Sequence, residues 1–232
     1  MDKPSHIVKS YEEQLKLLED TIIKMGTKAE DQLLMSIDAF AKKDLELSKK
    51  IIAEDEVIDA YENSIEHQVV NLIALRQPMG IDLRETVTAL KISSDLERIG
   101  DLSKNIAKKT LLINKNLSEP LTNSFNLLGN KVKKQLKSVI DSYLKRSKNV
   151  AINVWESDEQ IDILTTQCME DVIKYLKEDE QNLQNGAQLL FIAKNLERIG
   201  DHTTNIAEQI FFLVTGEYLE GNRPKNTDSE ML

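Results

Sequence analysis

The stretch that decides the fold is Asp95-Leu-Glu-Arg-Ile-Gly-Asp-Leu-Ser-Lys-Asn-Ile-Ala107, which recurs as Asn195-Leu-Glu-Arg-Ile-Gly-Asp-His-Thr-Thr-Asn-Ile-Ala207. Nine of the thirteen positions are identical. An upstream run, Asp55-Glu-Val-Ile-Asp59, returns in the same way as Asp158-Glu-Gln-Ile-Asp162. Because both motifs return in the same order at nearly the same offset, the sequence indicates a duplicated unit of about 100 residues.

The hydrophobic pattern predicts that each unit is a bundle of helices. Apolar residues recur at steps of three and four from about residue 11 to residue 214, the spacing of amphipathic helices. Only 8 glycines and 4 prolines punctuate the 232 residues, too few for many short strands and turns. We therefore expect an all-α protein of two tandem, sequence-similar three-helix bundles, at residues 1–116 and 117–220, followed by a polar tail at 221–232.

Turn and capping residues mark the expected ends of the helices in the first unit. Asp44 and Asp82 are expected to cap the second and third helices, because aspartate is a favoured N-cap residue. Between them, the apolar pattern predicts an unbroken second helix that ends at Gln77-Pro78-Met79-Gly80.

Composition excludes several classes of protein. The chain has 39 acidic against 30 basic residues, a net charge of -9, which argues against a nucleic-acid binder. The lone Cys168 excludes an internal disulfide and favours a reducing compartment. No apolar run has the length of a membrane span, and the first residues turn polar at once, unlike a secretory signal. We expect a cytoplasmic protein without direct membrane insertion.

Pairs of acids spaced four residues apart are the main candidates for chemistry. Residues at this spacing share one face of a helix. In each unit the two pairs lie at similar distances from the expected hairpin turn, so an antiparallel hairpin brings them to the same height. Carboxylates that face a neighbouring helix must be paired, protonated or bound to a cation. The predicted metal ligands are Asp55, Asp59, Glu97 and Asp101 in the first unit and Asp158, Asp162, Glu197 and Asp201 in the second.

An all-oxygen ligand set favours hard cations such as Mg, Mn or ferric iron, and carboxylates can bridge several metals. Glu62 and Glu66 have Thr165 and Met169 as counterparts in the second unit, so we interpret them as surface acids. His202 has Leu102 as its counterpart and is not an expected ligand. Residues that neighbour the acids and could hold them in place by ion pairs or hydrogen bonds are Arg98, Asn105, Arg198 and Asn205.

Gly100 and Gly200 stand inside the repeated motif, where glycine costs a helix about 1 kcal/mol relative to alanine. Close approach of a partner helix or of the metal site would explain them, and a hinge is the weaker explanation. Two alternatives to a metal-binding regulator stay open. One is a carboxylate-bridged metalloenzyme, a hydrolase or oxidase, although the sequence offers no nucleophile, histidine base or glycine-rich phosphate loop. The other is a metal-free structural bundle.

Several motifs resemble those of a known family: the Leu-Glu-Arg-Ile-Gly-Asp runs at 96–101 and 196–201, Arg76-Gln-Pro78, Asp82-Leu-Arg84 and the paired acids. On these motifs, the chain resembles the PhoU family over nearly its whole length. This family comprises phosphate-signalling accessory proteins of bacterial phosphate uptake. The resemblance implies two similar three-helix bundles, whose acidic motifs bind multinuclear iron or zinc clusters in some members.

The resemblance also implies the function and the partners. It implies a non-enzymatic, cytoplasmic negative regulator, often a homodimer. Such a regulator acts between the ATPase subunit of the phosphate ABC transporter and a membrane sensor histidine kinase. The second unit lacks counterparts to Arg76-Gln-Pro78 and Asp82-Leu-Arg84. A partner surface built on Arg76, Asp82 and Arg84 is therefore expected in the first unit alone.

Overall fold

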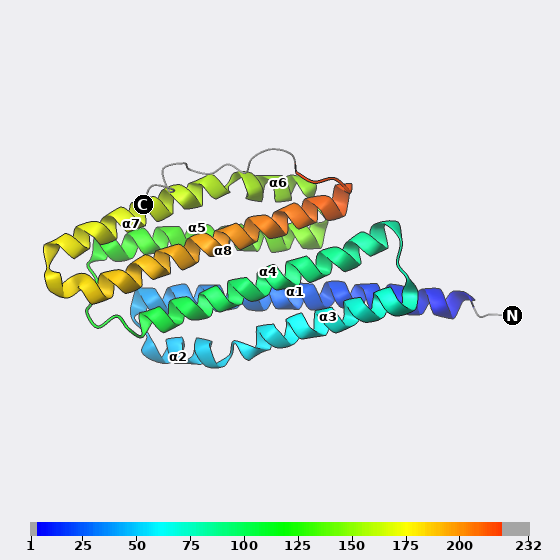
Figure 1. Ribbon diagram of the computed structural model, residues 1–232, viewed down its shortest axis with the longest axis horizontal. Helices are drawn as coiled ribbons and strands as arrows, with labels where there is room; N and C mark the ends of the chain where they lie inside the picture. The colour runs from blue at the N-terminus through cyan, green and yellow to red at the C-terminus, as the bar shows by residue number, and fades with distance from the viewer. Residues whose placement is uncertain (1–3, 220–232) are drawn as a thin grey trace.

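The computed structural model describes residues 4–219, with side chains from residue 10 onward, and within that range it contains helices and no strand (Figure 1). The predicted all-α class is confirmed. The helices of the first half are α1 Pro4–Lys42, α2 Leu45–Ala53, α3 Glu56–Arg76 and α4 Gly80–Thr110. Those of the second half are α5 Glu119–Lys145, α6 Lys148–Glu156, α7 Asp158–Glu178, the 3-10 turn η1 Glu180–Asn182 and α8 Leu183–Thr215. The tail at 221–232 lies outside the described residues.

Both halves have the same order of elements: a long helix, a short helix, and a hairpin of two long helices. The expectation of an unbroken second helix is wrong, because the chain breaks between Ala53 and Glu56 and again between Glu156 and Asp158. The breaks put Asp55 and Asp158 at the start of α3 and α7. Aspartate is a poor residue in a helix interior but is stabilised at an N-terminus, where the helix dipole is positive.

The two predicted caps have different outcomes. Asp44 accepts a hydrogen bond from the backbone N–H of Leu47 at 2.9 Å, so it caps α2 as expected. Asp82 does not cap α4, because this helix already begins at Gly80. The Asp82 carboxylate lies in the first turn instead and accepts a hydrogen bond from the Tyr11 hydroxyl at 2.9 Å.

The two halves share one hydrophobic core. Helices α4 and α8 run antiparallel side by side through the centre of the molecule, and α1 packs against both α4 and α5 (Figure 1). Buried apolar residues from both halves form a single cluster, in which the rings of Phe40 in α1 and Phe125 in α5 have centroids 5.0 Å apart. Neither half therefore buries its apolar surface by itself.

A half-buried ion-pair network adds a polar connection between the halves. Arg146 ends α5 in a left-handed conformation, with φ 48. Its guanidinium donates to Glu19 on α1 at 3.0 Å and to Glu85 on α4, and it lies over the ring of Tyr143 at 4.9 Å. Within the described range, none of the helices combines the length and the apolar character that crossing a membrane requires.

Candidate functional site

Two glycines let the helices that carry the acids approach closely. A Cβ on Gly100 would lie 2.8 Å from Cδ1 of Ile58 on α3, and one on Gly200 would lie 3.0 Å from Cδ1 of Ile161 on α7. These contacts are tighter than ordinary van der Waals packing. The expectation that the glycines allow close approach of a partner helix is confirmed, and this contact holds the acids of α3 and α4 at one level.

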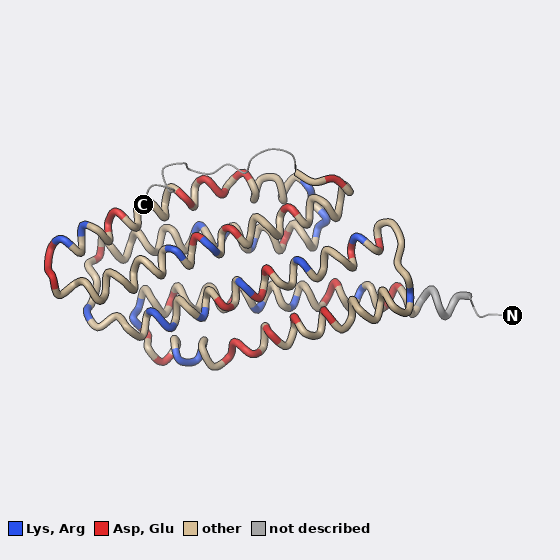
Figure 2. The backbone as a smooth tube through the Cα atoms, in the orientation of Figure 1, with Lys and Arg blue, Asp and Glu red and all other residues tan. Residues whose placement is uncertain are grey.

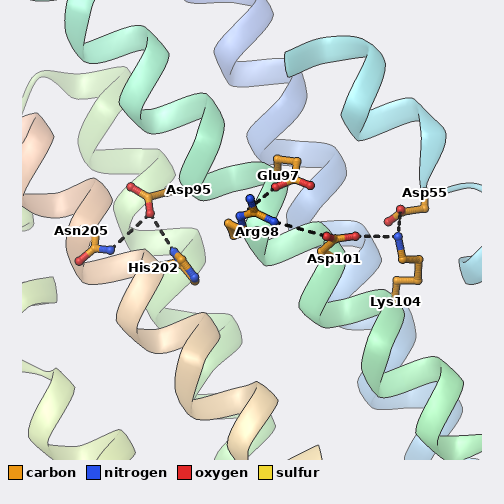
Figure 3. Close-up of polar contacts among 8 residues, drawn as sticks. All are labelled: Asp55, Asp95, Glu97, Arg98, Asp101, Lys104, His202 and Asn205. Carbon is orange, nitrogen blue, oxygen red and sulfur yellow. Dashed lines mark hydrogen bonds and ion pairs between the residues drawn. The ribbon is translucent and has the colours of Figure 1, made fainter. Parts of the chain in front are cut away.

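In the first unit a lysine joins two of the predicted ligands (Figure 3). Lys104 donates hydrogen bonds to Asp101 at 2.6 Å and to Asp55, and Asp55 is only 6% exposed. Burial alone would lower the pKa of Lys104, but the hydrogen bonds to Asp101 and Asp55 outweigh it and raise the pKa. The structure thus brings Asp55 and Asp101 together as predicted, with an ammonium group between them.

A buried glutamine supports the same carboxylate from the other side. Gln32 on α1 is 1% exposed and donates to Asp55 at 3.0 Å and to the carbonyl of Gly100 at 3.3 Å. The sequence analysis missed both Gln32 and Lys104. A signal for Lys104 was present, because it follows Asp101 by three residues and so lies on the same helix face.

Arg98 pairs with the acids as the sequence suggested. Its guanidinium lies 3.4 Å from Glu97 and 3.8 Å from Asp101 (Figure 3). The arginine side chain is 58% exposed, so each of these pairs contributes little to stability. Arg98 therefore contributes little to fixing the geometry of the cluster.

The remaining acids of the first unit repel one another. The pKa of Asp59 is raised by burial and by the charge of Asp55. Burial and Asp101 raise the pKa of Glu97, to which Glu62 and Asp59 also contribute. The charge of Asp59 on α3 thus acts on Glu97 of α4 across the hairpin, and Lys104 lies beside this concentration of negative charge.

The interpretation of Glu62 as a surface acid needs correction. Glu62 is half-buried, and burial and its neighbour Glu66 raise its pKa. Its charge acts on Glu97, so it belongs to the first cluster although the second unit has no equivalent acid. Glu66 is exposed, as expected. The repeat misled here because the two units do not carry identical sites.

The second cluster is built differently. Asp158 and Asp162 are 1% and 4% exposed, and the counterpart of Lys104 is Thr204, whose hydroxyl donates to the backbone carbonyl of Asp201 at 2.8 Å. Glu197 pairs instead with Lys194 on its own helix, at 2.5 Å. The internal cation of the first cluster therefore has no equivalent at this position of the second.

Nowhere in residues 4–219 do three or more Asp, Glu, His or Cys side chains converge closely enough to hold a metal ion. In the first unit the reason is visible, because Lys104 and Arg98 lie between the carboxylates (Figure 3). The oxygen donors suit a hard cation, but a metal between Asp55 and Asp101 would have to take the place of the Lys104 ammonium. Metal binding by the eight acids stays a prediction.

Of the remaining predicted neighbours, Asn205 contacts an acid other than the predicted ligands. Asn205 donates to Asp95 at 3.3 Å, and the same oxygen of Asp95 lies 2.8 Å from Nδ1 of His202 (Figure 3). These contacts join α8 to α4, so Asn205 helps to hold the two units together. Asn105 is half-buried on α4, and Arg198 is exposed on α8.

The predicted partner residues make contacts within the chain at the tip of the α3–α4 hairpin. Arg76 donates to Gln14 at 2.8 Å and to Ser10 at 2.9 Å, both on α1. The guanidinium of Arg84 lies against Gly216, where a Cβ would come within 2.0 Å of Nη1. This contact puts a positive charge at the C-terminus of α8, the negative end of the helix dipole. With Asp82 bound to Tyr11, all three residues tie the tip to α1 or α8.

The exposed surface of this tip is apolar. Leu75, Met79 and Ile81 are 72%, 82% and 63% exposed. Figure 2 shows the α3–α4 loop with little charge, whereas the tip formed by α7 and η1 carries a run of acidic residues, Glu178, Asp179 and Glu180. The two hairpins therefore end in chemically different surfaces.

Comparisons with known proteins agree over both halves. The PhoU domain model matches residues 22–110 and 125–210. A Caulobacter vibrioides protein named phosphate-specific transport system accessory protein PhoU homolog is 44% identical, over 95% of this chain and 96% of its own length. A protein of the same name from Rhizobium meliloti is 40% identical, over 96% and 94%.

Solved structures give the same result. The crystal structure of the phosphate transport system regulatory protein PhoU from Streptococcus pneumoniae matches with a TM-score of 0.84 and 30% identity, over 90% of this chain and 99% of that one. PhoU from Pseudomonas aeruginosa matches with a TM-score of 0.85 and 26% identity, over 89% and 100%. Two matched domains and close relatives that cover the full length make the conclusion plain: the chain belongs to the PhoU family.

Proposed function

We propose that this chain is a non-enzymatic regulator of phosphate uptake, a cytoplasmic protein that acts on the phosphate ABC transporter and on a membrane sensor histidine kinase when phosphate is plentiful. The observation that carries the proposal is the full-length match of both units to proteins named as accessory to phosphate-specific transport. The negative sign of the regulation, the homodimer and the kinase partner follow from the family resemblance.

In this proposal the ATPase subunit of the transporter docks on the tip of the α3–α4 hairpin. Exposed apolar side chains that lie close together commonly mark surfaces for protein partners. Met79 and Ile81 supply that surface, and the ties from Arg76, Asp82 and Arg84 to neighbouring helices hold it rigid. A rigid apolar tip loses little conformational freedom on binding, which favours affinity.

Substituting the tip should remove transporter binding without unfolding the protein. We expect the double variant Met79→Asp, Ile81→Asp to bind the purified ATPase subunit about 100-fold more weakly, because two apolar contacts become buried charges. Surface plasmon resonance measures the loss. In cells that carry this variant, phosphate-starvation genes should be expressed in rich phosphate.

The matched control is Leu183→Asp at the other hairpin tip, where Leu183 is 70% exposed. It adds the same kind of charge to an equally exposed apolar position and should leave ATPase binding unchanged. Equal binding by the wild type and the Met79→Asp, Ile81→Asp variant would show that the ATPase docks elsewhere. Normal repression in cells that lack the protein altogether would contradict the regulatory role itself.

The second element of the proposal is that the acidic clusters bind metal, iron or zinc by family resemblance or Mg or Mn by ligand chemistry. Burial raises the pKa values of Asp59 and Glu97, and neighbouring carboxylates raise them further. This supports the proposal, because a bound cation would relieve the repulsion. Lys104 already supplies one such charge, and a metal would supply a larger one. The bound metal would hold α3 against α4.

Metal analysis tests this element directly. In the double variant Glu97→Gln, Asp101→Asn, we expect the first unit to lose its metal while the helix content stays close to that of the wild type, since the changes are nearly isosteric. Elemental analysis of protein purified without chelator gives the stoichiometry. The control is Glu66→Gln, an exposed acid on α3. An unchanged stoichiometry in the double variant would refute the ligand assignment.

A further inference from the structure

A groove of about 210 Å³ lies between α5 and α6 in the second unit. Its polar walls are formed by Lys131, Lys134, Gln135 and Ser138 from α5, and by Asn153 and Ser157 from the region of α6. Neither the acidic clusters nor the proposed docking tip uses this groove.

At the corresponding positions of the first unit, charged side chains form ion pairs. Helices α1 and α2 correspond to α5 and α6 with a constant offset, because Lys43 and Arg146 occupy the same left-handed position after the long helix. In this register Lys131 corresponds to Lys28, whose ammonium pairs with Glu54 at 3.1 Å. Lys50 lies 3.7 Å from the same carboxylate.

The second unit has lost both acids of that arrangement. Ser157 stands in place of Glu54, and Lys134 stands in place of Asp31. Asn153 takes the position of Lys50, so the four matched positions change from two cations and two anions to two cations alone. These four positions therefore carry two positive charges, while the acids Glu156, Asp158 and Glu159 flank Ser157 in the sequence.

The contact that Lys131 makes at the groove is with a neutral group. The Lys131 ammonium donates to the neutral side-chain carbonyl of Gln160. Burial and the neighbouring charge of Lys134 lower the pKa of Lys131. Among the described residues, no acid raises it. Two ammonium groups that repel one another at the edge of a cavity gain most from a bound anion.

The floor of the groove is fixed in shape. Gln135 is 3% exposed, and its amide donates to the carbonyl of Val154 at 3.3 Å and to the hydroxyl of Ser157 at 3.4 Å. It therefore holds α5 and the end of α6 at a constant separation. Beside Ser157, α7 begins without a side-chain cap on its N-terminal amides. The acids Asp158 and Glu159 occupy the first turn of this helix, so its positive end does not add to the attraction for an anion.

We propose that the α5–α6 groove binds inorganic phosphate, held by the ammonium groups of Lys131 and Lys134 and by the amide of Asn153. A phosphate dianion matches the two positive charges, and the donors at the groove are those that bind oxyanions in proteins. The site is independent of both elements of the proposed function, because it shares no residue with the acidic clusters or the docking tip.

Calorimetric titration of the full chain with inorganic phosphate at constant ionic strength tests the site. The wild type should bind, and Lys131→Gln and Lys134→Gln should each weaken binding about tenfold, the effect of removing one charge-assisted hydrogen bond. Phosphate should also raise the melting temperature of the wild type more than an equal ionic strength of chloride does. The control is Lys137→Gln, an exposed lysine of α5 outside the groove, which should bind as the wild type does.

A second variant removes the charge excess while keeping both lysines. Ser157→Glu restores the acid of the first unit, so Lys131 should pair with it as Lys28 pairs with Glu54, and phosphate binding should be lost while the protein stays folded. Absence of phosphate binding by the wild type would overturn the proposal. So would unchanged affinity in both Lys134→Gln and Ser157→Glu, because phosphate would then bind outside the groove.

Discussion

Replacing Lys104 with glutamine is expected to lower the free energy of unfolding by about 3 kcal/mol, the usual cost of removing one partner from a buried ion pair. Lys104 is the cation that Asp55 and Asp101 share, and Asp55 is almost fully buried. Without the ammonium, the Asp55 carboxylate would keep the hydrogen bond from Gln32 but lose its ion pair. Its charge would then lie beside those of Asp59 and Asp101, which already repel one another.

Urea unfolding followed by circular dichroism measures this loss, with chelator present so that metal does not replace the lysine. The control is Lys108→Gln, one turn further along α4, where the side chain is exposed. The double variant Lys104→Gln, Asp55→Asn removes the buried charge together with its partner and should recover most of the stability. Equal stability of Lys104→Gln and the wild type would show that the ion pair does not support the fold.

The same variant has a second expected result. With the ammonium gone, the first cluster becomes a set of carboxylates without an internal cation, so added Mn²⁺ or Mg²⁺ should stabilise Lys104→Gln more than it stabilises the wild type. A metal that raises the melting temperature of both proteins equally would bind elsewhere. This comparison separates a competition between lysine and metal from binding at an unrelated surface.

The sequence was sufficient to predict the architecture because the repeat and the apolar spacing agree. Because nine of thirteen positions are identical, the two motifs are expected to have the same local structure. Because Asp59 and Glu97 lie at similar distances from the turn, they are expected to meet across a hairpin. The charge of Asp59 contributes to the raised pKa of Glu97 across that hairpin. Such a prediction is possible because the relative height of two residues in a hairpin follows from the number of residues between each of them and the turn.

What the sequence did not reveal depends on side chains that reach between elements far apart in the chain. Gln32 supports Asp55 from α1, and no spacing rule connects them. Asn205 contacts Asp95, in a different unit, because α4 and α8 lie side by side. The break before Asp55 was also missed, since the apolar pattern continues through it and the cost of ending a helix there depends on local hydrogen bonds.

Comparison of matched positions in the two units shows where their local charges differ. The first unit has Lys104 where the second has Thr204, and Glu54 where the second has Ser157. Each difference changes the local charge, while the order of helices stays the same. The first unit balances its charges internally at both places, with Lys104 between two acids and Glu54 between two lysines. Duplication thus preserved the fold and allowed the second unit to change what it can bind.

Replacing Phe125 with alanine is expected to lower the free energy of unfolding by about 4 kcal/mol, the largest effect of any single substitution considered for this chain. Phe125 is 1% exposed and packs against Phe40 of the other unit, with the two rings tilted by 53°. Truncation removes an aromatic pair worth about 1 kcal/mol beyond its buried area and leaves a cavity between α1 and α5. The control is Leu127→Ala, whose side chain is 57% exposed on the same helix and should change stability by less than about 0.5 kcal/mol.

Because the two units share one core, their unfolding should stay a single transition in the wild type and in Phe125→Ala. The fluorescence of Trp155, the sole tryptophan, reports on the second unit, whereas circular dichroism reports on all helices. The two signals should therefore change at the same urea concentration. A fluorescence transition separate from the dichroism transition would mean that the units fold independently. A loss below about 1.5 kcal/mol in Phe125→Ala would mean that the contact between α1 and α5 is dispensable, and coupling between the units would then depend on the α4–α8 contact and on the ion pairs of Arg146.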